Sequence, residues 1–254
     1  MTTNQNSVTR RNWILSALAM GGAVAATGMS APQVQDSSTD EEKPKKGARI
    51  LFQGDSITDV QRHRKHVGPN NGAALGRGYP FLIASTLLAK FPGSELKCFN
   101  RGISGNKVPD LAARWQKEAI DLKPDVLSIL VGVNDIWHKL GGGYDGTVKT
   151  YEDGFLALIQ QTQKALPKTK IVICEPFVLR CGAVGEKWFP EFDERRAAAK
   201  RVTKATNCTW IPFQEIFDEA TKHAAPSYWA GDGVHPSIAG HALMAKAWVE
   251  LVKI

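Results

Sequence analysis

The chain has 254 residues, of which 43% are hydrophobic and 22% are charged, a composition typical of a globular protein with a sizeable core. Its formal net charge at pH 7 is +7. The basic residues are spread along the sequence, without the aromatic or motif pattern that accompanies nucleic-acid binding. A nucleic-acid partner is therefore not predicted.

The first 46 residues differ in composition from the rest of the chain. Arg10 and Arg11 precede an apolar run of small residues over 13–27, which is too short to span a bilayer comfortably. We expect residues 1–31 to be a twin-arginine-type signal peptide, so that the protein is exported to the periplasm or the extracellular space. The alternative is an N-terminal anchor that is never cleaved.

A polar, charged stretch over 32–46 predicts a disordered linker, and residues 47–254 remain as one domain. No cysteine precedes Cys98, which disfavours a lipoprotein, and we predict no stable membrane anchor.

The four cysteines do not have the spacing of a metal site. In an exported protein Cys174 and Cys181 could form a disulfide. Cys98 and Cys174 lie inside apolar runs, however, which favours buried free thiols. His63 and His66 have no third ligand nearby, so we predict neither a metal nor a cofactor.

From residue 47 onward, short apolar runs alternate with longer segments of helical periodicity. The runs predict five strands, one ending at Gly54 and the others at 96–100, 126–131, 170–174 and 209–212. The longer segments predict helices at 79–90, 108–120, 151–166, 191–206, 216–223 and 237–252, and residues 60–78 read as a long loop. This alternation indicates one α/β domain with a parallel sheet.

Polar residues follow a glycine at three predicted strand ends. Ser56 follows Gly54, Asn134 follows Gly132, and Gly105 lies in a glycine-rich turn after the second strand. Functional loops of parallel sheets gather at the carboxyl ends of the strands. Each residue also has an ordinary reading: Ser56 as a helix cap, Asn134 as a turn residue, and Gly105 as a position with positive φ.

A late loop adds Asp232 and His235, three residues apart. In a compact loop this spacing can bring a carboxylate to one imidazole nitrogen while the other nitrogen faces a serine. Acyl transfer needs a hydroxyl nucleophile, a base, a group that orients the base, and donors for the developing oxyanion. Ser56, His235 and Asp232 are our candidates for the first three, and the backbone N–H groups of Ser56 and Gly105 with the Asn134 amide are candidates for the donors.

Four sequence blocks, in this order, resemble those of the SGNH (GDSL) serine hydrolases: Gly54–Ile57, Asn100–Gly105, Gly132–Asp135 and Asp232–Pro236. The resemblance covers residues 47–254 and implies a flavodoxin-like three-layer sandwich around a five-stranded parallel sheet. It implies the catalytic triad Ser56, Asp232 and His235, with Ser56, Gly105 and Asn134 forming the oxyanion hole. Asp55 is then a structural residue.

A finer resemblance is to the serine acetylxylan esterases and related carbohydrate deacetylases, through the segments Ala74–Tyr79, Gly105–Val108, Ala113–Trp115 and His235–His241. It implies an esterase that removes acetyl groups from a polysaccharide, with an acetylated carbohydrate as its partner. The sequence leaves open whether the protein is a monomer or a homo-oligomer. Three tryptophans could stack on sugar rings or simply pack: Trp137, Trp188 and Trp229. The rival functions are a lipid or thioester hydrolase on the same fold and a non-catalytic flavodoxin-like binding protein.

Overall fold

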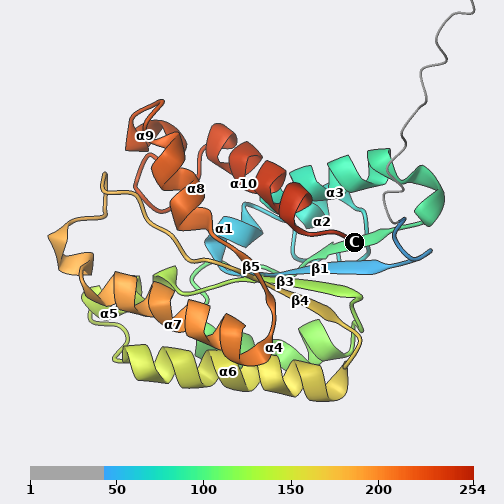
Figure 1. The fold of residues 1–254 in the computed structure, drawn as a ribbon, viewed down its shortest axis with the longest axis horizontal. Helices are drawn as coiled ribbons and strands as arrows, with labels where there is room; N and C mark the ends of the chain where they lie inside the picture. The colour runs from blue at the N-terminus through green and yellow to red at the C-terminus, as the bar shows by residue number, and fades with distance from the viewer. Residues whose placement is uncertain (1–42) are drawn as a thin grey trace, which may run out of the picture. The chain divides into compact units, whose positions relative to one another are not determined.

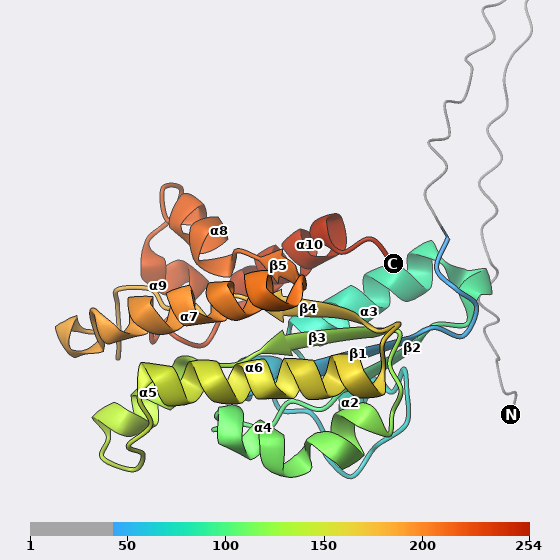
Figure 2. The same ribbon diagram turned by 60° about the horizontal axis from the view of Figure 1, so that its bottom comes forward.

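The computed structural model describes residues 43–254 (Figures 1 and 2). The predictions for the signal peptide at 1–31 and for most of the linker lie outside the described residues. The last linker residues contact the domain: Pro44 is buried, and Lys45 and Lys46 pair with Asp125 and Glu95 at 3.0 and 2.9 Å. These residues are therefore part of the folded unit.

The centre of the fold is the predicted five-stranded sheet, in which every pairing is parallel. Its strands are β1 (Arg49–Gly54), β2 (Lys97–Asn100), β3 (Val126–Leu130), β4 (Lys170–Cys174) and β5 (Thr209–Ile211), in the order β2-β1-β3-β4-β5. The strands are almost continuously apolar because helices cover both faces of the sheet. The predicted fold class is confirmed.

Two helical layers enclose the sheet (Figure 1). One layer contains α3 (Tyr79–Lys90), α8 (Phe213–Ala220) and α10 (Ile238–Leu251). The other contains α4 (Val108–Trp115), which continues into a π-helical turn (Gln116–Ile120), together with α6 (Val148–Ala165) and α7 (Glu191–Thr206). Shorter elements occupy the connections: α1 (Ser56–Asp59), α2 (Gly72–Leu75), α5 (Val133–Leu140), α9 (Pro226–Trp229) and the 3₁₀ turns Pro92–Ser94 and Glu186–Trp188.

The alternation of side chains along each strand divides the core into two clusters. In β1, Ile50 and Phe52 join the cluster under α3 and α10, whereas Leu51 joins the cluster under α4 and α6. Trp248 of α10 lies in the first cluster and Trp115 of α4 in the second, and neither is exposed. Each face of the sheet thus has its own apolar cluster, because successive side chains of a strand point to opposite faces.

The helix predicted at 216–223 forms at Phe213–Ala220, and α9 lies where no helix was predicted. Two further departures lie in the connections. The expected loop at 60–78 contains α2, whose N-terminus is capped by the Asn71 side chain accepting from Ala74 N at 3.0 Å. The turn expected at 132–135 is instead the start of α5. Both helices are short, so the apolar periodicity that marks a longer helix has no room to develop.

All four cysteines are free thiols, and Cys98 and Cys174 are buried as the apolar runs predicted. Burial raises the pKa of both thiols to about 12. Among residues 43–254, no helix has the length and apolarity needed to cross a bilayer.

Replacement of Trp248 tests the packing of α10 on the sheet. The indole is fully buried, and its Nε1 donates to Ser128 Oγ of β3 at 3.0 Å. We expect Trp248→Ala to lower the free energy of unfolding by about 3–5 kcal/mol, because it leaves a cavity and removes a buried hydrogen bond. Ile238→Ala, on the same helix at an 89% exposed position, is the control and should change it by less than about 0.5 kcal/mol in urea unfolding. Equal effects would contradict this account.

Candidate active site

The site lies where the chain reverses its direction across the sheet. The chain passes from β1 to β2 on one side, and then returns past β1 to form β3 on the other. Loops that follow such adjacent strands leave a crevice at their carboxyl ends, where ligands of open α/β sheets bind. Ser56 follows β1, Gly105 follows β2 and Asn134 follows β3, so the three predicted strand-end residues share this edge.

The turn after β1 places Ser56 at the first position of α1. A Cβ on Gly54 would lie 2.4 Å from the Leu130 carbonyl oxygen, so only glycine fits there. Asp55 is the N-cap, and its Oδ1 accepts the Ile57 N–H at 3.0 Å. The capping role therefore belongs to Asp55, and the Ser56 hydroxyl is free to bond elsewhere.

Ser56, His235 and Asp232 form a continuous hydrogen-bonded chain. Ser56 Oγ lies 2.8 Å from His235 Nε2, and His235 Nδ1 lies 2.6 Å from Asp232 Oδ2. An ionised Asp232 accepts the Nδ1 proton, which leaves Nε2 able to accept from the serine hydroxyl. The side chains of His235 and Asp232 are 44% and 40% exposed, so the chain lies open to solvent.

Asp232 also organises its own loop. Its Oδ1 accepts the backbone N–H groups of Val234 and His235 at 2.9 and 2.7 Å. Partial burial alone would raise the pKa of this carboxyl, but the hydrogen bonds from His235 and Val234 outweigh burial and lower it. Asp232 is consequently ionised across the pH range in which a histidine titrates.

Residues 179–184 hydrogen-bond to the loop that carries Asp232 and His235. Leu179 N donates to Gly233 O, and Ala183 N donates to Asp232 O, both at 2.8 Å. Gly182 has φ +58°, and a Cβ there would lie 2.4 Å from Asp232 Cα. This contact fixes the backbone of Asp232 against a chain segment more than forty residues earlier.

Gly105 lies in the loop after β2, and hydrogen bonds connect this loop both to the serine turn and to Asn134 of α5. Ile103 N donates to Gly54 O at 3.0 Å, which ties this loop to the end of β1. Asn134 Nδ2 donates to Asn106 O at 3.3 Å, which ties it to α5. Gly105 has φ +83°, so it also occupies the positive-φ position that its residue type suggested. A Cβ there would lie 3.7 Å from the His138 ring.

Asp59 is a positioning residue to which sequence reasoning assigned no role. It is 2% exposed, and its Oδ2 accepts both the backbone N–H and the hydroxyl of Ser104 at 2.9 Å. Arg62 and Arg64 pair with the same carboxylate. Burial raises its pKa, but Arg64 and Ser104 outweigh burial and lower it. The available signal was its place three residues after Ser56, which puts it on the same short helix.

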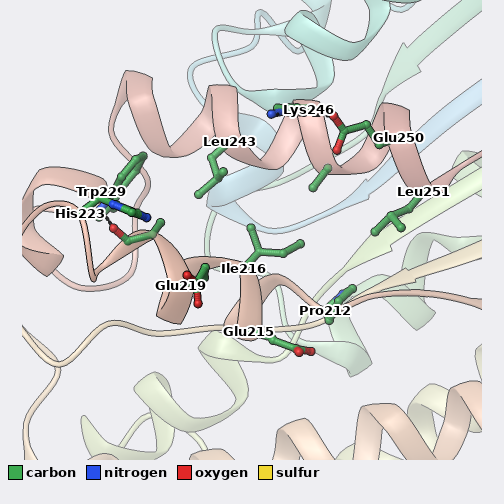
Figure 3. A pocket seen from close by; sticks show the side chains of 12 residues that line it. Pro212, Glu215, Ile216, Glu219, His223, Trp229, Leu243, Lys246, Glu250 and Leu251 are labelled. Carbon is green, nitrogen blue, oxygen red and sulfur yellow. Dashed lines mark hydrogen bonds and ion pairs between the residues drawn. The ribbon is translucent and has the colours of Figure 1, made fainter.

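The three tryptophans lie in different environments. Trp137 is partly buried, with its ring centroid 5.8 Å from that of His235. Trp188 is only 3% exposed and packs against Trp137 and Phe192, which favours the packing alternative over stacking on a sugar. Trp229 lines an apolar groove of about 820 Å³ between α8 and α10, and neither Ser56, Asp232 nor His235 lines this groove (Figure 3).

The model of the GDSL-like lipase/acylhydrolase family matches residues 52–243 of the chain. The chain belongs to this family. It is therefore a carboxylic ester hydrolase of the GDSL type, and the rival reading as a non-catalytic binding protein is overturned.

Relatives of known name or structure agree with this assignment. The chain is 35% identical to an acetylxylan esterase of Geobacillus stearothermophilus over 205 residues, covering 80% of this chain and 93% of that protein. The crystal structure of an acetylxylan esterase from that organism superposes with a TM-score of 0.73 at 32% identity, over 83% of this chain and 96% of the other. A structure from Parabacteroides merdae, described as that of a GDSL-like lipase, has a TM-score of 0.79 at 49% identity, over 82% and 96% of the two chains.

Replacement of Gly102 tests the packing of the 101–107 loop against α1. A Cβ there would lie 2.5 Å from Asp59 N and 2.8 Å from the Thr58 carbonyl carbon. We expect Gly102→Ala to displace the 101–107 loop, to lower stability by about 1–3 kcal/mol and to reduce hydrolysis of a small acetyl ester. Gly68→Ala, where nothing lies within 4 Å, is the matched control. Thermal unfolding and initial rates measure both effects, and identical behaviour of the two variants would refute the contact.

Proposed function

We propose that this family member is an acetyl esterase that deacetylates a polysaccharide or oligosaccharide, with Ser56 as the nucleophile. The observation that carries the proposal is the chain of contacts from Ser56 Oγ through the His235 ring to Asp232. Nucleophile, base and orienting carboxylate stand in the order that acyl transfer requires.

In the first half-reaction Ser56 Oγ attacks the acetyl carbonyl carbon while His235 Nε2 takes the hydroxyl proton. Asp232 stabilises the imidazolium through Nδ1. The tetrahedral intermediate collapses, the bond between the carbonyl carbon and the sugar oxygen breaks, and His235 returns its proton to that oxygen. The deacetylated sugar leaves, and the acetyl group remains on Ser56.

In the second half-reaction water attacks the acetyl-serine carbonyl, with His235 again taking the proton. Collapse of this intermediate releases acetate and restores the Ser56 hydroxyl. In both steps the carbonyl oxygen becomes negative. We assign its stabilisation to the N–H groups of Ser56 and Gly105 and the side-chain amide of Asn134, which follow three adjacent strands.

Two observations support a carbohydrate substrate. The relatives named as acetylxylan esterases align with nearly their whole length. The base, His235, is 44% exposed, and such an open position admits a polymer more readily than an enclosed channel would. Trp137, beside His235, is the remaining candidate for stacking on a sugar ring. The lipid or thioester hydrolase remains the alternative.

We also propose export by the twin-arginine route. The support for this proposal is the Arg10–Arg11 pair and the apolar run that follows it in the sequence.

Replacement of the nucleophile tests the mechanism. Ser56→Ala should lower kcat for acetyl ester hydrolysis by about 10⁴-fold or more while thermal stability stays close to that of the wild type. Ser85→Ala is the matched control, because that hydroxyl lies exposed on α3 and donates to Phe81 O of the same helix. Hydrolysis that survives in the Ser56 variant would exclude the acyl-enzyme.

A substrate panel separates the proposed function from its rival. We expect wild-type protein to prefer acetyl over octanoyl nitrophenyl esters, and to release acetate from acetylated xylan or another acetylated polysaccharide, because no long acyl chain needs to be accommodated. Acetate release from the polysaccharide is measured by chromatography, with the Ser56→Ala variant as the background. A preference for the octanoyl ester would favour a lipid acyl hydrolase.

A further inference from the structure

Two carboxyl groups are buried next to the proposed site without taking part in the triad. Asp55 directly precedes Ser56 and is 1% exposed, and Asp135 directly follows Asn134 and is fully buried. In each of them the Oδ2 atom is buried and has no hydrogen-bond partner among the residues that the structure describes. Buried carboxyl oxygens without partners are costly when ionised, so their presence calls for an explanation.

The other oxygen of each group caps a helix of the site. Asp55 Oδ1 accepts the Ile57 N–H of α1 at 3.0 Å, and α1 begins with Ser56. Asp135 Oδ1 accepts the Val108 N–H at 3.4 Å, at the start of α4, directly after the loop that carries Gly105. A neutral carboxyl group can make either of these bonds, because its carbonyl oxygen still accepts.

The charges around the two groups differ. Asp135 feels the cations Arg195 and Lys107, although the Arg195 guanidinium also donates to Glu191 and Lys107 pairs with Asp110 at 2.7 Å. Among residues 43–254, the charged group that acts on Asp55 most strongly is an anion, Asp135 itself. The titratable and charged groups that face the pair from the packed elements are Tyr79 of α3, Lys107, Asp110 of α4, Tyr144, Tyr151 of α6 and Arg195 of α7.

We propose that Asp55 is a positioning residue that works in its protonated form, and that the charge of Asp135 keeps the proton there. The proposal rests on the acyl-transfer function assigned to Ser56. A neutral Asp55 caps α1 through Oδ1 while placing no negative charge beside the Ser56 N–H, where the oxyanion is to form. Loss of that proton would put a buried anion next to a developing anion.

Burial and the nearby Asp135 raise the pKa of Asp55 to about 7, and burial raises that of Asp135 to about 6. Both values lie above 3.8, the ordinary pKa of an aspartate side chain. The native state therefore binds more protons than the unfolded state between about pH 4 and pH 7, so these groups make stability fall as pH rises through that window. The same deprotonation of Asp55 is expected to lower kcat on the alkaline side.

Asp55→Asn tests the proposal, because the asparagine amide imitates a protonated acid and keeps the capping oxygen. We expect the wild-type kcat for a nitrophenyl acetate to decline several-fold between about pH 6.5 and pH 9, with the decline absent in Asp55→Asn. The free energy of unfolding in urea should fall less between about pH 4.5 and pH 8 in the variant than in the wild type. Asp55→Ala, which loses the cap, should be slower than Asp55→Asn at every pH.

Asp135→Asn provides a second variant with an opposite signature. Removal of its charge should release the proton from Asp55 at lower pH, so the alkaline decline of kcat should shift downward by a measurable fraction of a pH unit. Asp153→Asn, on an exposed carboxylate of α6, is the control and should leave both profiles unchanged.

Infrared spectroscopy of the wild type reads the proton directly, independently of activity. We expect a protonated carboxyl band at about pH 6 to which Asp55 contributes more than Asp135, since exposed carboxylates are ionised there. Asp55→Asn should lower this band by more than Asp135→Asn does. The proposal is overturned if Asp55→Asn leaves the band unchanged, or if Asp55→Asn keeps the wild-type pH dependence of both kcat and stability. Failure of the acyl-transfer function would show differently, as hydrolysis that survives in Ser56→Ala.

Discussion

The pairing of β1 with β3 is the constraint on which the site depends. Gly54 pairs with Leu130 at the last position of this ladder, and the close approach of the Leu130 carbonyl leaves room only for a glycine. The chain can then turn sharply, and Asp55 caps the first turn of α1. A shift in this register would move Ser56 away from the ends of β2 and β3, and every later contact in the site would lose its counterpart.

The loop after β2 is held from three directions, which explains how a segment with little secondary structure can present a defined backbone N–H. The end of β1 accepts from Ile103, Asn134 of α5 donates to Asn106, and Asp59 of α1 accepts from Ser104. Each bond comes from an element that also positions a member of the site. Preorganisation of this kind allows backbone donors to stabilise a transition state without rearrangement during the reaction.

The sequence was sufficient to predict the sheet and to single out Ser56, His235 and Asp232, which the structure joins in one hydrogen-bonded chain, but not the contacts that support them. Strands buried on both faces are continuous apolar runs, and an aspartate three residues before a histidine can close only a small range of loops. The helix α5 was missed because a glycine, an asparagine and an aspartate at 132–135 also suit a turn. The role of Asp59 and the burial of Trp188 depend on contacts between distant segments, which local patterns do not encode.

The site has a solvent-exposed side and a buried side, and this difference in burial sets the protonation states of its titratable groups. His235 and Asp232 are about two-fifths exposed, so they can exchange protons with water, and Asp232 remains charged through the bonds it accepts. Asp55, one residue from Ser56, is buried, and the charged group that raises its pKa is another carboxylate, Asp135. Water screens a charge at an exposed position, whereas a charge on the buried Asp55 would act on the oxyanion with less screening. It follows that two aspartates of one site need opposite protonation states, and their environments supply them.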